Sequence, residues 1–187
     1  MIRDIQKIRD DIIEKKSTIG ELLYTDPDII EVLDSPKIDP TCPDEAMYEC
    51  IYPFIKLPGI QDESKSYICY TFDDNGINPV NKAMKAQFVK VVIFVHQDLV
   101  RTKLGADRHD LLGYLVKDVL NMSNTLGLQL NCISDREGAT DTNYVTRTLQ
   151  FEMSAPGSMK PYKTNQYERK SIVENHDKTV QRETVGR

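Results

Sequence analysis

Isoleucine and leucine recur through the first part of the chain at spacings of three, four and seven residues, with charged residues between them. The positions are Ile2, Ile5, Ile8, Ile12, Ile19, Leu22 and Leu23. This periodicity predicts an amphipathic helix over residues 2–23. Asp26-Pro27 has the form of an N-cap followed by proline at the first helical position, and it predicts a second, short helix at Asp28–Leu33.

Three runs rich in aromatic and β-branched residues follow, and each predicts a strand. The first is Met47–Leu57, which Pro53 places at a sheet edge or a bulge. The second is Ser66–Asp73, where apolar and polar residues alternate. The third is a long strand from about Met84 to His96, after the turn-rich loop DDNGINPVNK.

The stretch FVKVVIFVHQD, residues 88–98, is the most hydrophobic in the chain. Both faces of such a strand are largely apolar, which is typical of a strand that is covered on both sides. We expect the helix at Leu111–Met122 to cover one face and the N-terminal helix to cover the other. The polar end, from His96 through the loop Gln97–Arg108, is then the place to look for a neighbouring subunit.

A second strong helix is predicted in GADRHDLLGYLVKDVLNM, residues 105–122, because leucine and valine form a wide apolar stripe. Asp107 is its predicted N-cap, and Asp110 three residues later resembles a capping box. Two more strands are expected, Leu126–Ser134 and Tyr144–Met153, joined by the polar loop DREGATDTN.

The predicted element order is α-α-β-β-β-α-β-β. It indicates an α+β fold with a mainly antiparallel sheet of about five strands packed against amphipathic helices. We assign residues 1–153 to this domain. Residues 154–187 are polar and aperiodic, and we expect them to form an extended C-terminal arm that is flexible unless assembled.

Composition and charge narrow the class of protein. The chain has 187 residues, 40% of them hydrophobic, and a net charge of −5. Residues 160–187 contribute +3, so the preceding 159 carry −8. An acidic body disfavours tight binding of nucleic acid, whereas a basic tail could dock on a neighbouring copy. The chain lacks an apolar run of the ~18 residues that a membrane helix needs, and its charged N-terminus predicts an intracellular protein.

Candidate chemistry is sparse. The four cysteines form no C-x-x-C pair and are expected to be reduced thiols. His109 and Asp110 suggest a metal-binding dyad, but a metal site needs three or four converging ligands. Nucleophile, phosphate-loop and dinucleotide motifs are missing as well. We therefore predict no catalytic, cofactor or metal site and no enzyme activity. Lys90 and Arg147 each interrupt an apolar strand face, so each should reach a rim, a carboxylate or a subunit boundary.

The order and spacing of several stretches resemble tail-terminator and related neck (head–tail connection) proteins of tailed double-stranded-DNA bacteriophages. The stretches are LLYTDPDIIEVL, IYPFIKLPG, SYICYTFD and KVVIFVHQDLVRTKLGADRHDLLGYLVKDVLN, within roughly residues 1–153. The resemblance implies a sheet packed against helices, assembled as a homohexameric ring that caps the tail tube and joins it to the head connector. DNA would pass through the ring without sequence-specific binding. The arm after Met153 departs from the minimal family domain.

This resemblance predicts a structural virion protein of the tail or neck, assembled in the host cytoplasm. Its expected partners are further copies of itself, the tail tube protein and the head-closure or connector protein. Whether the arm reaches a neighbouring subunit, the tube, a sheath or the connector stays open. The alternatives are another neck component, such as a head-closure or adaptor-type protein, or a small ligand-binding or enzymatic domain. The candidate subunit-interface residues are Gln97, Arg101, Lys103, Arg108, Asp135, Arg136, Glu137, Tyr162 and Tyr167.

Overall fold

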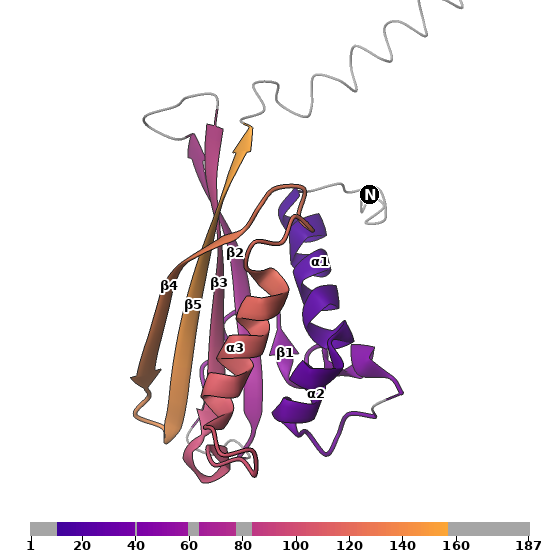
Figure 1. Ribbon diagram of the computed structural model, residues 1–187, viewed down its shortest axis with the longest axis vertical. Coiled ribbons are helices and arrows are strands. Elements are labelled where there is room, and N and C mark those ends of the chain that lie inside the picture. The colour runs from indigo at the N-terminus through magenta and orange to yellow at the C-terminus, as the bar shows by residue number, and fades with distance from the viewer. Residues whose placement is uncertain (1–10, 40, 60–63, 78–83, 157–187) are drawn as a thin grey trace, which may run out of the picture. The chain divides into compact units, whose positions relative to one another are not determined.

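The computed structural model describes residues 11–39, 41–59, 64–77 and 84–156 (Figure 1). The chain divides into two units, Met1–Ala155 and Pro156–Arg187. The start of the predicted N-terminal helix and the arm residues Tyr162 and Tyr167 lie outside the described residues.

The α+β class is confirmed. The elements are α1 (Asp11–Thr25), α2 (Pro27–Leu33), η2 (Pro43–Ala46), β1 (Ile51–Tyr52), β2 (Ser66–Ile77), β3 (Met84–His96), η3 (Gln97–Leu99), α3 (Arg108–Leu120), β4 (Asn131–Ala139) and β5 (Tyr144–Pro156). Apart from the short 3-10 turns η2 and η3, this is the predicted order. Within the described residues, none of the helices is long and apolar enough to cross a membrane.

The five strands form one mixed, mostly antiparallel sheet in the order β1-β2-β3-β5-β4. β2 pairs antiparallel with β3, with Ile68 opposite Ile93, and β4 pairs antiparallel with β5. The predicted strand Met47–Leu57 is too long, because only Ile51–Tyr52 form β1, which pairs parallel with β2. Its place at one edge of the sheet is the position that Pro53 predicts. β3 is the central strand, as its hydrophobic sequence predicts.

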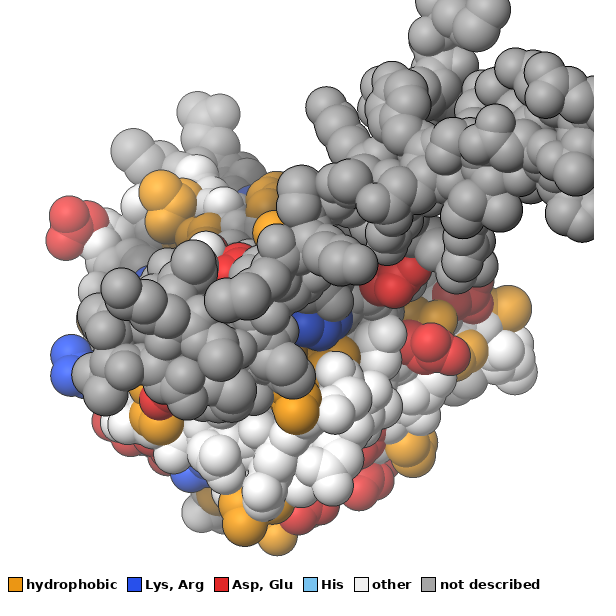
Figure 2. Space-filling view, turned by 90° about the horizontal axis from the view of Figure 1, so that it is seen from above, with side chains coloured by type: hydrophobic (Ala, Val, Ile, Leu, Met, Phe, Trp, Pro, Cys, Tyr) orange, Lys and Arg blue, Asp and Glu red, His pale blue; other side chains and the backbone are white. Residues whose placement is uncertain are grey.

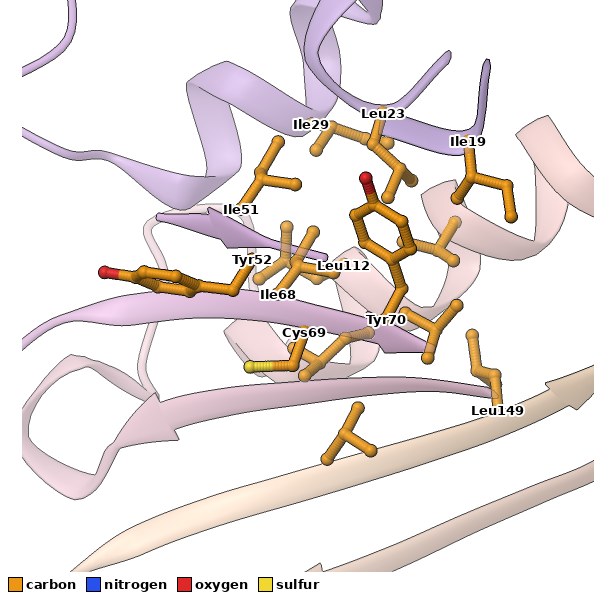
Figure 3. Packing of buried hydrophobic residues seen from close by; sticks show 14 of the residues in the cluster. Ile19, Leu23, Ile29, Ile51, Tyr52, Ile68, Cys69, Tyr70, Leu112 and Leu149 are labelled. Atoms are coloured by element: carbon orange, nitrogen blue, oxygen red, sulfur yellow. The ribbon is translucent and has the colours of Figure 1, made fainter. Parts of the chain in front are cut away.

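Helices α1 and α3 lie on the same face of the sheet (Figure 1). Figure 3 shows Tyr70 of β2 pointing towards Ile19 and Leu23 of α1. Its hydroxyl donates to the carbonyl of Lys16 (2.9 Å), which fixes α1 on this face. The expectation that the N-terminal helix covers the opposite face of β3 was therefore wrong. An apolar stripe shows that one side of a helix is buried, but it does not show which face of the sheet the helix packs against.

Among the described residues, aromatic side chains rather than a helix cover the second face. Tyr67 of β2 stacks on Phe94 of β3, with ring centroids 4.9 Å apart and planes 13° apart. The rings of Tyr52 and Tyr144 contact Tyr67 edge-on. The chain that follows β1 also lies here, because the Tyr67 hydroxyl donates to the carbonyl of Lys56 (3.4 Å). In the part of the chain that the structure describes, the second face of the central strands is thus closed by these side chains and by the chain after β1, without a second layer of helices.

The local signals of the short helices gave mixed results. The carboxylate of Asp26 accepts hydrogen bonds from the N–H groups of Asp28 (2.9 Å) and Ile29 (3.2 Å), so the predicted cap of α2 is confirmed. Asp107 is the N-cap residue of α3, but its side chain makes no capping hydrogen bond. The predicted capping box is wrong, because the carboxylate of Asp110 binds an arginine of β5 instead.

The position of β4 also differs from the prediction. The strand runs from Asn131 to Ala139, whereas Leu126 and Leu130 are buried in the turns before it. The residues DREGA, predicted as part of a polar loop, are the second half of this edge strand. Apolar residues in the turn and charged residues in the strand reversed the usual pattern.

Candidate assembly surfaces

The crossing segment between β3 and α3, residues 97–107, is a loop that is held by hydrogen bonds within itself. Arg101 and Asp107 pair as an antiparallel bridge, and the hydroxyl of Thr102 donates to a backbone carbonyl across the turn (2.6 Å). Leu104 lies within this turn with 76% of its surface exposed. An apolar side chain displayed on an ordered turn is a candidate contact for another chain.

The predicted interface residues of this segment have different surroundings. Three of them are exposed: Gln97, Arg101 and Lys103. Arg108 is not, because only 11% of its side chain is exposed. Its guanidinium donates to the carbonyl of Val32 (2.6 Å) and to the carboxylate of Asp34 (3.1 Å). Arg108 therefore connects the crossing segment to α2 within the chain.

Arg147 of β5 reaches two carboxylates, as its position in an apolar strand face predicts. Its guanidinium donates two hydrogen bonds to Asp135 of β4 (2.9 and 2.8 Å) and one to the carboxylate of Asp110 of α3 (2.7 Å). Lys117 of α3 donates to Asp135 as well (2.6 Å). These hydrogen bonds, with Arg147 first, lower the pKa of Asp135 from 3.8 to about 2. The cluster connects α3 to the edge of the sheet. The carboxylate of Asp135, a predicted interface residue, therefore binds partners within its own chain.

The other predicted interface residues of this region lie on the edge strand. Arg136 and Glu137 of β4 are exposed, and the nearby Ile133 has 50% of its surface exposed. β4 is the last strand of the sheet and pairs only with β5. An exposed edge strand offers unpaired backbone groups to another chain, so β4 is a second candidate assembly surface.

Helices α1 and α2 and the chain from Asp34 to Pro53 form a groove that the sequence patterns did not predict. One cavity, of about 590 Å³, is lined mainly by apolar side chains: Tyr24, Pro27, Ile30, Pro36, Ile38 and Pro43. A second, of about 510 Å³, adjoins it at Tyr24 and is lined by residues that include Ile13, Gly20, Met47, Tyr48 and Pro53. We call the two cavities together the α1–α2 groove. Pro36 and Pro43, which predict only a loop in the sequence, form part of its wall.

Three potential metal ligands gather at the start of α3. Asp107, His109 and Asp110 each bring one ligand atom within 4.8 Å of the others. The fit to a metal is poor, because Asp110 already accepts from Arg147. His109 Nε2 lies 3.8 Å from Asp110, so a metal here would bind Nε2, and the buried Nδ1 would have to donate to an acceptor that the described residues do not supply. His96 is not part of this cluster and packs edge-on against a tyrosine of β5.

Comparison with known proteins gives a family but no activity. No match to the chain was found among curated proteins. A model of the family named YomW matches residues 18–153. This segment includes most of α1, all elements from α2 to β4, and β5 up to Met153. Because the match covers well over half of the chain, the protein belongs to the YomW family.

Proposed function

We propose that this protein is a structural component of a phage tail, a tail terminator that assembles into a homohexameric ring. The ring caps the tail tube and joins it to the head connector, and the genome passes through its lumen. The observation that carries this proposal is the run from β3 through the crossing segment to α3. Its sequence is the longest stretch of the resemblance to tail terminators, and the crossing segment displays an exposed Leu104 on an ordered turn.

The charge of the domain supports the same function. Residues 1–159 carry −8, and in the end-on view of Figure 2 carboxylate side chains outnumber lysine and arginine side chains on the visible face. Phosphates are repelled by such a surface, so DNA can slide past without being held. A protein that grips DNA would need the opposite sign of charge.

The size of the particle tests this proposal. We expect light scattering of the purified full-length chain to give a mass several times 21.4 kDa, and negative-stain images to show rings, either alone or on tail tubes. The variant Leu104→Asp should weaken ring formation, whereas the matched change Tyr114→Asp, on exposed Tyr114 of α3, should not. Monomers alone, both with and without tail tubes, would refute the ring. Locating the protein in an intact virion would distinguish a tail terminator from another neck component.

A further inference from the structure

We propose that the α1–α2 groove receives the basic arm segment, residues 160–170, of a second copy of this chain. The inference rests on the proposed assembly function, because an arm held by a neighbour links adjacent subunits. Beyond the proposed function, the inference names the surface that receives the arm, the segment of the arm that binds there and the opposite charges that attract the two. The apolar lining of the groove, and its charge opposite to that of the arm, support this contact.

The lining of the groove suits an extended segment with aromatic side chains. Tyr24 lies between the two cavities, and proline and tyrosine side chains form a large part of both walls. Two residues of the second cavity remain unusually exposed for their type, Ile13 at 57% and Tyr48 at 65%. Each cavity is of the size that holds a ligand or a few side chains, and apolar walls favour aromatic occupants.

The acidic charge of the domain is concentrated around this groove. Residues 21–45 contain eight carboxylates and one lysine, a net charge of −7, compared with −8 for all of residues 1–159. Three of these carboxylates line the cavities: Glu31, Asp34 and Asp44. Asp34 is already paired with Arg108, whereas Glu31 and Asp44 are exposed at the groove. The surface therefore selects a cationic partner.

The arm supplies the matching charge and side chains in one short segment. Residues 160–170, KPYKTNQYERK, contain four basic residues and one acidic residue, together with Tyr162 and Tyr167. The whole +3 of the arm lies here, because residues 171–187 contain three of each sign. Tyrosine side chains can enter the apolar cavities while lysine and arginine pair with the carboxylates at their rims.

The proposed assembly function favours a second copy over the same chain. An arm bound in the groove of the next subunit links two subunits, whereas an arm bound in its own groove links none. A contact between two copies also depends on protein concentration.

A single tryptophan tests the inference in the full-length chain. The protein contains no tryptophan, so Tyr167→Trp places the only one in the arm segment. We expect its emission to shift to shorter wavelength as the protein concentration rises, because the indole enters the apolar groove of another copy. A shift that persists at concentrations where light scattering shows monomers alone would place the arm in its own groove and overturn the second copy. Constant emission of a solvent-exposed indole would overturn binding altogether.

Charge-reversal variants then locate the surface. In the Tyr167→Trp chain, Glu31→Lys together with Asp44→Lys should raise the midpoint concentration of the shift by about tenfold, because two rim carboxylates become repulsive. Asp141→Lys together with Asp118→Lys changes the charge equally on the β4–β5 turn and on α3, and it should leave the midpoint unchanged. Equal effects of the two double variants would overturn the groove as the receiving site.

Exposed Cys42, next to Pro43 of the groove, provides a direct contact test. With Tyr167→Cys, mild oxidation should give disulfide-linked dimers that disappear when Cys42→Ser is added. The absence of Cys42-dependent dimers would contradict the inference.

Negative-stain images of the Tyr167→Trp chain test the arm contact and the proposed ring separately. Rings in which the indole stays exposed refute the arm contact alone, and a concentration-dependent shift without rings refutes the ring alone.

Discussion

A Cβ atom added to Gly113 of α3 would lie 2.4 Å from Cδ of Arg147 on β5. Arg147 occupies the place of a side chain at Gly113, and 15% of its own side chain is exposed. From there its guanidinium binds Asp135 of the edge strand and Asp110 of the first turn of α3. The helix and the sheet edge are therefore joined by a partly buried charge cluster that requires glycine at this point of the helix.

Gly113→Ala should destabilise the protein, although alanine is the better helix former by about 1 kcal/mol. The new methyl group must displace the aliphatic part of Arg147 and so disturb its hydrogen bonds to both carboxylates. We expect the free energy of unfolding in urea to fall by about 1–3 kcal/mol.

A double-mutant cycle separates this contact from a general effect on the helix. In an Arg147→Ala background, Gly113→Ala should be neutral or stabilising, because the displaced side chain is no longer there. Asp118→Ala, at an exposed position of the same helix, is the control for helix propensity. An equal loss of stability with and without Arg147 would contradict the explanation.

Asp135 should make stability depend on pH in the acid range. Arg147 and then Lys117 lower its pKa from 3.8 to about 2, so the stabilisation is complete above pH 4 and is lost as the pH falls towards 2. Because 28% of the Asp135 side chain is exposed, solvent screening reduces the contribution to about 1 kcal/mol. Asp135→Asn should remove about that much from the free energy of unfolding at pH 7 and much less near pH 2.

Denaturant unfolding of both proteins at several pH values measures this difference. The control is Asp118→Asn, which removes a carboxylate from an exposed position of α3 that makes no contact in the cluster. A difference between the wild type and Asp135→Asn that stays constant from pH 7 to pH 2 would show that Asp135 is not stabilised by the cluster.

Sequence patterns predicted the elements whose signals are local. Asp26 and Pro27 are adjacent to the helix that they start, and the hydrophobic run of β3 marks a central strand wherever its neighbours lie. The same patterns failed where the cause is distant in sequence. Asp135 lies in a strand that pairs with β5, and its carboxylate is bound there by Lys117 and Arg147, which are 18 and 12 residues away. A charged sequence gives no sign of such partners.

The candidate assembly surfaces could be predicted only in part. The exposed crossing segment was found, because a polar stretch between a strand and a helix indicates a surface loop. The α1–α2 groove was missed, because Tyr24 comes from a helix, Pro36 from a loop and Tyr48 from the chain before β1. Only the fold brings these residues together.

Tyr70 and Gly20 form a second close contact between the sheet and a helix. A Cβ on Gly20 would lie 2.6 Å from the Tyr70 hydroxyl oxygen, which donates to the carbonyl of Lys16 (2.9 Å). Burial raises the pKa of Tyr70, so the hydroxyl stays protonated as a donor. We expect Tyr70→Phe to lower the free energy of unfolding by about 1 kcal/mol. Gly20→Ala should lower the free energy of unfolding by more than this in the wild type. In the Tyr70→Phe background it should lower it much less, because the hydroxyl no longer occupies the space.

Thermal and urea unfolding of the two single variants and the double variant measures that coupling. Thr18→Ala, on a side chain whose hydroxyl donates to the carbonyl of Glu14 in the same helix, is the control for α1. If Gly20→Ala has the same effect on stability with and without the Tyr70 hydroxyl, that hydroxyl is not what excludes a side chain at position 20.

The four free thiols should differ widely in reactivity. Burial raises the pKa of Cys50 to about 12 and that of Cys69 to about 11, whereas Cys42 is exposed and Cys132 is half-buried. At pH 8, a shift from 9 to about 12 lowers the thiolate fraction of Cys50 by on the order of 10³, in addition to steric protection. A thiol reagent added to the native protein should therefore modify Cys42 first, Cys132 more slowly, and the other two only on unfolding. Mass spectrometry of the modified peptides identifies the sites, and Cys42→Ser should remove the fastest phase. Rapid modification of Cys50 or Cys69 without denaturant would show that the core around β1 and β2 opens readily, contrary to the packing described above.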